Sequence, residues 1–89
     1  MEIYVLPRVH DRHPELTSED VLTAFHSVMT DAQRDNDTWV CIGLDQHGRD
    51  VEMVYKQMGD MVLIYHAMTP PTRKTINEIN ELNGKRRNR

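Results

Sequence analysis

The sequence predicts a single small α+β domain. Its 89 residues are enough for one domain and no more. Three apolar segments, partly β-branched and separated by turn signals, follow one another between residues 39 and 67. Segments whose apolar residues recur at helical spacing lie before and after this group. The order predicts a β-α-β-β-β-α arrangement, in which the helices pack against an antiparallel sheet.

The first half of the chain predicts one strand and one helix. Residues 2–6 are expected to form a short strand that Pro7 ends, and residues 8–13 one helical turn or a loop. Thr17 is the predicted N-cap of a helix over residues 18–29, because Asp20 follows three positions later. One face of that helix carries Val21, Leu22, Phe25, Val28 and Met29. The polar residues 30–38 are predicted to be a loop.

The three strands of the meander are expected at residues 39–44, 51–58 and 61–67. Gly59-Asp60 is a two-residue hairpin signal that pairs Met58 with Met61. Uniform pairing from there sets Ile64 opposite Tyr55, Tyr65 opposite Val54 and His66 opposite Met53. One face then has Val51, Met53, Tyr55, Val62, Ile64 and His66. The other face, expected to point away from the helices, has Glu52, Val54, Lys56, Leu63, Tyr65 and Ala67.

The last helix is predicted after the prolines at positions 70 and 71, which suit a helix start. Thr69 is the expected N-cap, and Ile76, Ile79 and Leu82 share one face. Gly84 is expected to end the helix. The predicted domain therefore covers residues 1–84, and residues 85–89 form a basic C-terminal tail.

Composition restricts the functional classes. The single cysteine, Cys41, excludes an internal disulfide framework and is expected to be a buried thiol. No secretory pattern occupies the N-terminus and the longest apolar run, residues 61–65, is too short to span a bilayer, so we expect a cytoplasmic protein. The net charge is −3, but four of the 11 Lys and Arg residues lie in the last five positions. The acidic remainder is not typical of a general nucleic-acid binder, so an RNA site would have to be a local patch.

Several short motifs occur together in this chain. The segment W-V-C-I-G-L-D-Q-H-G-R-D-V-E-M-V-Y contains an I-G strand and a G-R turn. The segment G-D-M-V-L-I-Y-H-A-M-T-P-P-T-R-K contains a G-D hairpin, an H-A strand end and an R-K helix start. Earlier, D-R-H-P-E-L-T-S-E-D-V sets a basic residue and a histidine before an acidic-capped helix. With these motifs, which span about two thirds of its length, the chain resembles the BrnT-like branch of the RelE/ParE superfamily of toxins.

The resemblance implies a RelE-like fold and the toxin role in a bacterial type II toxin–antitoxin pair. It also implies endoribonuclease activity, without a cofactor, and neutralisation by a protein antitoxin. The expected partners are that antitoxin and RNA, in a homodimer or a toxin–antitoxin hetero-oligomer, and no membrane. One departure from the pattern is Met68, which follows His66-Ala67 where many relatives have a basic residue.

Metal-independent RNA cleavage by the ribose 2′-hydroxyl needs a base, an acid and cations near the phosphate. Histidine can serve as acid or base at neutral pH, and arginine presents a fork that matches a phosphate. The predicted catalytic residues are therefore His13, His66 and Arg73. The predicted RNA-binding residues are Arg12, Lys56, Tyr65 and Lys74.

Other interpretations of the same residues remain open. His66 could equally be a half-buried histidine of the core, and Arg73 and Lys74 a solvated basic turn. His10, Asp11 and His13 could begin a metal site, but no second pair with ligand spacing follows, so no metal is predicted. The low charge and Met68 favour an alternative function, a non-catalytic interaction module that binds a protein target as ParE-like toxins do. An inactive small domain is the third hypothesis.

Overall fold

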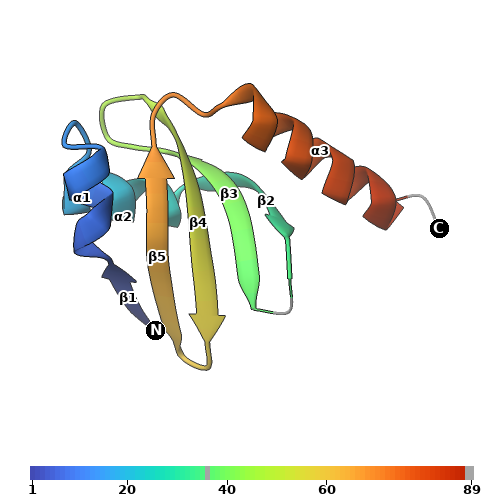
Figure 1. Cartoon of the computed structure of the whole chain (residues 1–89), viewed down its shortest axis with the longest axis horizontal. Coiled ribbons are helices and arrows are strands. Elements are labelled where there is room, and N and C mark those ends of the chain that lie inside the picture. Colours follow the sequence, from blue (N-terminus) through green and yellow to red (C-terminus); the bar gives the residue numbers. More distant parts are fainter. Residues whose placement is uncertain (36, 88–89) are drawn as a thin grey trace.

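The computed structural model describes residues 1–35 and 37–87. Strand β1 (Glu2–Val5) leads into two helices, α1 (Pro7–Arg12) and α2 (Ser18–His26). Four strands follow: β2 (Val28–Gln33), β3 (Thr38–Leu44), β4 (Asp50–Met58) and β5 (Met61–Met68). The chain then forms α3 (Arg73–Arg87), which extends beyond the edge of the sheet (Figure 1). The protein is thus a small α+β domain, as predicted.

The five strands form one mixed sheet in the order β1-β5-β4-β3-β2. Each successive pair from β2 to β5 is antiparallel, whereas β1 runs parallel to its neighbour β5. The prediction of a purely antiparallel sheet is therefore wrong at β1. Helices α1 and α2 connect β1 to β2 at the opposite edge of the sheet, so β1 and β5 are not consecutive strands and no hairpin forces them to be antiparallel.

Helix α2 begins as predicted but ends earlier. Thr17 and Asp20 form a capping box, in which each side chain accepts a hydrogen bond from the other residue's backbone N–H. The helix ends at His26, and Val28 begins strand β2. The predictions of a helix to residue 29 and of a loop over residues 30–38 are both wrong. Strand β2 is polar because it is an edge strand, in which only Ala32 is fully buried.

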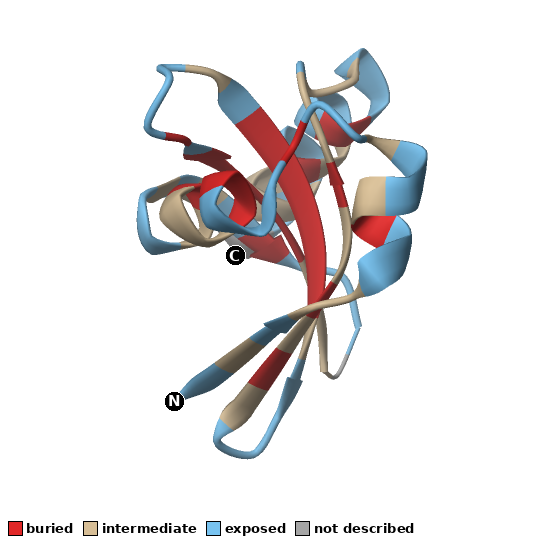
Figure 2. Ribbon diagram, turned by 90° about the vertical axis from the view of Figure 1, so that its left-hand side faces the viewer, coloured by how far each residue is buried: buried red, intermediate tan, exposed pale blue. Residues whose placement is uncertain are grey.

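Helices cover both faces of the sheet, and a separate apolar core lies on each. The larger core joins α1 and α2 to the sheet, with Val9, Leu16 and Val21 packed against Met53 and Ile64. The smaller core lies under α3 and consists of Ala32, Val40, Ile42, Val54 and Ile79. Figure 2 shows the resulting buried residues along the middle strands, between helices on either side. The face that contains Val54 was predicted to point away from the helices, and this prediction is wrong.

The hairpin between β4 and β5 begins in the predicted register and then leaves it. Met58 pairs with Met61, and Tyr55 pairs with Ile64. The next pair is Val54 with His66, so Tyr65 is an extra residue on β5, a β-bulge. The predicted pairs of Tyr65 with Val54 and of His66 with Met53 are therefore wrong. Beyond the bulge it is Ala67 that pairs with Met53 and enters the larger core.

Helix α3 differs from the prediction at both ends. Thr72, and not Thr69, caps its first turn, because the Thr72 hydroxyl accepts a hydrogen bond from the Thr75 N–H at 3.2 Å. The helix continues through Gly84 to Arg87, so the predicted end at Gly84 is wrong. Of the predicted tail, residues 85–87 are helical and residues 88–89 lie outside the described part of the chain.

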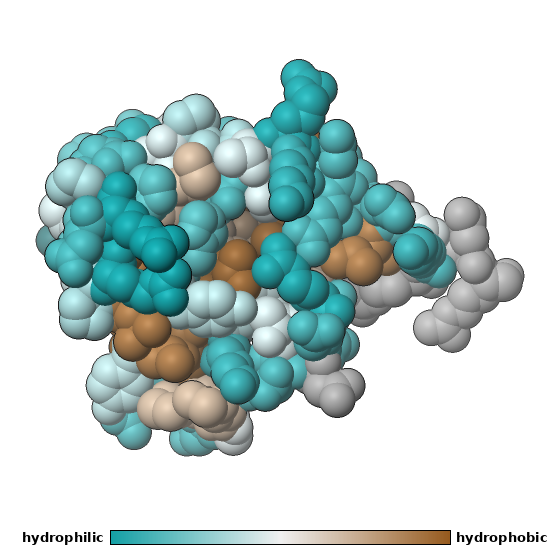
Figure 3. Space-filling model, viewed as in Figure 1, coloured by the Kyte–Doolittle hydropathy of each residue, from teal (hydrophilic) through white to brown (hydrophobic). Residues whose placement is uncertain are grey.

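The surface in Figure 3 is mostly hydrophilic, with hydrophobic groups exposed beside β1 and beneath α3. Among the described residues, no helix is both long and apolar enough to cross a membrane.

Candidate functional site

A cleft of about 400 Å³ opens where the end of β5 meets α1 and the start of α3. We call it the His66 cleft. Its charged and aromatic lining residues are Arg8, Arg34, Glu52, Tyr65, His66, Lys74 and Glu78. The β-bulge explains why Tyr65 and His66, which are neighbours in sequence, both line it: a bulge sets two successive residues opposite one residue of the partner strand.

His66 is held by a buried carboxylate. Its Nε2 lies 2.8 Å from Oε2 of Glu52, whose side chain is only 5% exposed. The other oxygen, Oε1, accepts hydrogen bonds from the backbone N–H of Thr72 at 2.7 Å and from the Thr72 hydroxyl at 3.1 Å. Burial acts to raise the pKa of Glu52, but the hydrogen bonds from His66, Thr72 and Thr75 outweigh it and lower that pKa to about 2. Glu52 is therefore an anion at every physiological pH.

His13 lies against His66. The two imidazole rings meet edge to face, with centroids 6.1 Å apart and an angle of 87° between their planes. His13 follows the last residue of α1, and its Nδ1 lies 3.7 Å from a carboxylate oxygen of Glu15. Two imidazole side chains thus come together from segments 53 positions apart in the chain.

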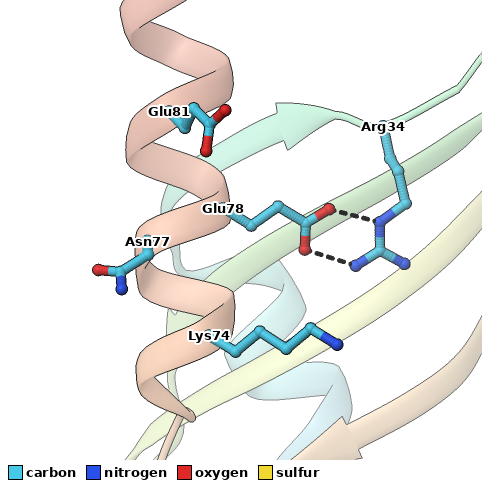
Figure 4. A pocket seen from close by; sticks show the side chains of 5 residues that line it. All are labelled: Arg34, Lys74, Asn77, Glu78 and Glu81. Atoms are coloured by element: carbon cyan, nitrogen blue, oxygen red, sulfur yellow. Dashed lines mark hydrogen bonds and ion pairs between the residues drawn. The ribbon is translucent and has the colours of Figure 1, made fainter.

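Three cations line the His66 cleft, and one of them is already paired. Arg34 forms a two-pronged hydrogen bond with Glu78 of α3, each N–O distance being 2.8 Å (Figure 4). This pair raises the pKa of Arg34 and lowers that of Glu78 through their mutual hydrogen bond. Lys74 points toward the same guanidinium, from one turn earlier on α3 (Figure 4). Arg8 reaches the cleft from α1.

The seven residues predicted from the sequence divide into two groups. His66, Tyr65 and Lys74 line the cleft, and His13 contacts His66. Arg12, Lys56 and Arg73 are not among the lining residues that the structure describes. Lys56 is engaged elsewhere, since its Nζ lies 3.6 Å from a carboxylate oxygen of Asp37. Arg73 is exposed in the first turn of α3, one position before Lys74.

Sequence reasoning missed four charged residues of the cleft: Arg8, Arg34, Glu52 and Glu78. Uniform pairing from the hairpin set Glu52 and His66 on opposite faces of the sheet, so only knowledge of the bulge could have joined them. Arg34 was assigned to a loop, and it follows directly after β2. Arg8 carried one usable signal, its place in the basic and polar segment that ends at His13.

A second buried polar cluster has a structural role. Asp20 and Asp45 are both almost fully buried, and Arg49 donates hydrogen bonds to both carboxylates. Gln46 adds a hydrogen bond to Asp20, so the turn between β3 and β4 is fastened to the start of α2. Among the described residues, no buried side-chain nitrogen or oxygen lacks a partner. Within the same residues, no three His, Cys, Asp or Glu side chains are grouped as metal ligands.

Comparisons of the chain with protein-family models, with curated proteins and with solved structures gave no match. Function is therefore inferred from the geometry of the His66 cleft together with the motifs.

Proposed function

We propose that this chain is a metal-independent endoribonuclease and the RelE-like, BrnT-like toxin of a type II toxin–antitoxin pair. The contact between His13 and His66 carries the proposal, because it joins two imidazoles at the wall of a cleft lined by cations. One imidazole can take the proton of a ribose 2′-hydroxyl while the other protonates the leaving oxygen.

The cations of the cleft can hold a phosphate beside these histidines. Arg8 and Lys74 reach the cleft from different helices, and both can offset the negative charge that develops on phosphorus-bound oxygens. Tyr65 presents an aromatic ring in the same cleft, where an unpaired base could stack. Arg73 stays a predicted catalytic residue, because it precedes Lys74 at the start of α3 and is exposed toward solvent.

The toxin role explains how such an enzyme would be controlled. An antitoxin that covers the start of α3 and the cleft would block Arg73 and Lys74 together with the two histidines. The small double core is consistent with a domain that gains stability from such a partner through binding.

The proposal is tested by expressing the wild-type chain, His13→Ala and His66→Ala in bacteria while following growth and total RNA. We expect the wild type to arrest growth and fragment RNA, and each substitution to abolish both effects. His26→Ala is the matched control, because His26 is an exposed histidine on α2. Purified wild type should also cut a synthetic RNA in EDTA and leave a 2′,3′-cyclic phosphate. Intact RNA in both assays would refute the nuclease assignment.

One observation favours a second function, a ParE-like toxin that binds a protein target without catalysis. Glu78 already occupies the guanidinium of Arg34, and Met68 lines the cleft where a further cation was expected, so the cleft is only weakly basic. Growth arrest with intact RNA that survives both histidine substitutions would establish this alternative. No arrest by a soluble, folded chain would remove both toxin roles.

A further inference from the structure

Glu52 is an unusual residue to find inside the sheet. It is the third residue of β4, its side chain is 5% exposed, and its neighbours in the strand are apolar. An ionised carboxylate is costly to bury unless each oxygen is hydrogen-bonded. Both oxygens of Glu52 have such partners, Thr72 at one and His66 at the other. The hydrogen bonds to Thr72 fasten the carboxylate in place, so its second oxygen is presented to His66 in a fixed position.

The chemistry of the donors decides where the proton on His66 lies. A backbone N–H can only donate, so Oε1 of Glu52 must accept from Thr72. The ionised carboxylate carries no proton, and the low pKa of Glu52 keeps it ionised. A 2.8 Å contact between Oε2 and Nε2 therefore needs a hydrogen on Nε2 of His66. A neutral imidazole has only one such hydrogen, which leaves the lone pair on Nδ1. Among the described residues, Nδ1 of His66 has no protein hydrogen-bond partner.

We infer that Glu52 is a positioning residue that holds His66 as the Nε2–H tautomer, so that Nδ1 of His66 accepts the proton in RNA cleavage. The role of Nδ1 rests on the proposed function, whereas the tautomer follows from the contacts of an ionised Glu52. The two histidines then have separate roles: His66 is the base, and protonated His13 is the acid.

The step balances with these two groups. The ribose 2′-oxygen forms a bond to phosphorus while its proton passes to Nδ1 of His66. The bond between phosphorus and the 5′-oxygen breaks, and that oxygen takes a proton from His13. The products are a 2′,3′-cyclic phosphate and a 5′-hydroxyl. His66 ends with one proton more and His13 with one fewer, and exchange with water restores both.

Glu52→Gln offers a sharp test, because glutamine has the same shape with one donor in place of an acceptor. Its oxygen can keep the hydrogen bond from Thr72 only if its NH₂ group turns toward His66. An NH₂ group facing Nε2 needs a lone pair there, so the tautomer should reverse to Nδ1–H. Nδ1 then has no lone pair for the 2′-hydroxyl. In serine proteases the corresponding carboxylate-to-amide change lowers kcat by about 10⁴-fold through the wrong tautomer.

The tautomer is read from long-range ¹H–¹⁵N NMR spectra of the full chain at about pH 8.5, where an ordinary imidazole is neutral. His66→Ala identifies the signals. We expect Nε2–H in the wild type and in Glu2→Gln, a control whose exposed carboxylate bonds Tyr4, and Nδ1–H in Glu52→Gln. The kcat of Glu52→Gln on a synthetic RNA should fall by at least about 10²-fold with KM nearly unchanged. Glu52→Asp, which keeps the acceptor, should recover part of the loss.

Each outcome decides the inference. Nδ1–H in the wild type overturns it without any variant, and so does Nε2–H in a folded Glu52→Gln. An active wild type whose Glu52→Gln variant reverses the tautomer but keeps its kcat overturns the role of Nδ1. If the wild type cleaves no RNA, the proposed function fails, while reversal of the tautomer still supports Glu52 as the residue that orients His66.

Discussion

Nε2 of His66 lies 2.8 Å from Oε2 of Glu52, and this contact joins β5 to β4 beside the bulge. The same carboxylate accepts two hydrogen bonds from Thr72, which caps α3. One buried anion thus connects two strands of the sheet with the start of the last helix. Its protonation would weaken all three connections together.

We predict that Glu52 contributes to stability above about pH 4.5 and loses this contribution as the pH falls toward 2. Its pKa drops from an ordinary 4.5 to about 2 on folding, so the unfolded chain takes up the proton first as acid is added. The loss should reach about 2–3 kcal/mol in the free energy of unfolding. Urea denaturation between pH 6 and pH 2.5 measures it.

Glu52→Gln should show a shallower fall in stability over the same interval. Some dependence should remain, because Asp20, Asp45 and Glu78 also have lowered pKa values. If the curves of wild type and variant run parallel from pH 6 to pH 2.5, Glu52 is not ionised and hydrogen-bonded as the structure has it.

The bulge marks the limit of what the pattern of the hairpin could predict. Gly59-Asp60 set the correct pairing as far as Tyr55 and Ile64. Nothing in the alternation of residues 61–67 marks Tyr65 as an extra residue, because the run is almost continuously apolar and fits either register. The bulge brings His66 to Glu52, 14 positions away, and beside His13, 53 positions away, and contacts at such separations leave no mark in the local pattern.

The sequence also predicted only some of the strands and only one of the two buried faces of the sheet. Three features were correctly predicted, since each depends on neighbouring residues: the strand segments after residue 37, the capping box at Thr17 and the buried Cys41. Strand β2 was missed because an edge strand with one buried side chain resembles a polar loop. The second core under α3 was also missed. Val54 and Glu52 share a face of the sheet, and the polar residues on that face suggested that it was exposed.

We predict that Glu78→Gln strengthens RNA binding by freeing Arg34. The carboxylate of Glu78 occupies both prongs of the guanidinium, which a phosphate could otherwise bind. One additional phosphate contact should make the plot of log K against log salt steeper by about 0.7. Binding is measured by fluorescence anisotropy with a labelled single-stranded RNA, in the His66→Ala background so that no cleavage occurs.

Glu81→Gln is the matched control for this prediction. It removes the same charge from the same helix, but Glu81 pairs with Lys85 at 3.6 Å and not with Arg34. Equal gains in affinity for the two variants would show a general effect of net charge, and the specific role of Arg34 would be refuted.

The thiol of Cys41 should be inert in the native protein. Cys41 is fully buried, opposite Met53 in the neighbouring strand, and burial raises the pKa of its thiol to about 12. Because the thiolate is the reactive form, labelling should need the sheet to open. Reaction with a disulfide reagent should therefore be slow in buffer and complete at once in guanidinium chloride. Rapid labelling in buffer would mean that β3 is not covered by α2.

Gly43 and Gly84 should respond to alanine in opposite directions. A Cβ at Gly43 would overlap the backbone carbonyl of Ala24, so Gly43→Ala should push α2 away from β3 and cost about 2–3 kcal/mol of stability. A Cβ at Gly84 meets open space within α3, where alanine should stabilise the chain by about 0.5–1 kcal/mol. Urea denaturation of both variants at equal m-value measures the two changes. A neutral Gly43→Ala would contradict the close packing of α2 on the sheet, and a destabilised Gly84→Ala would contradict a helix that continues beyond Gly84.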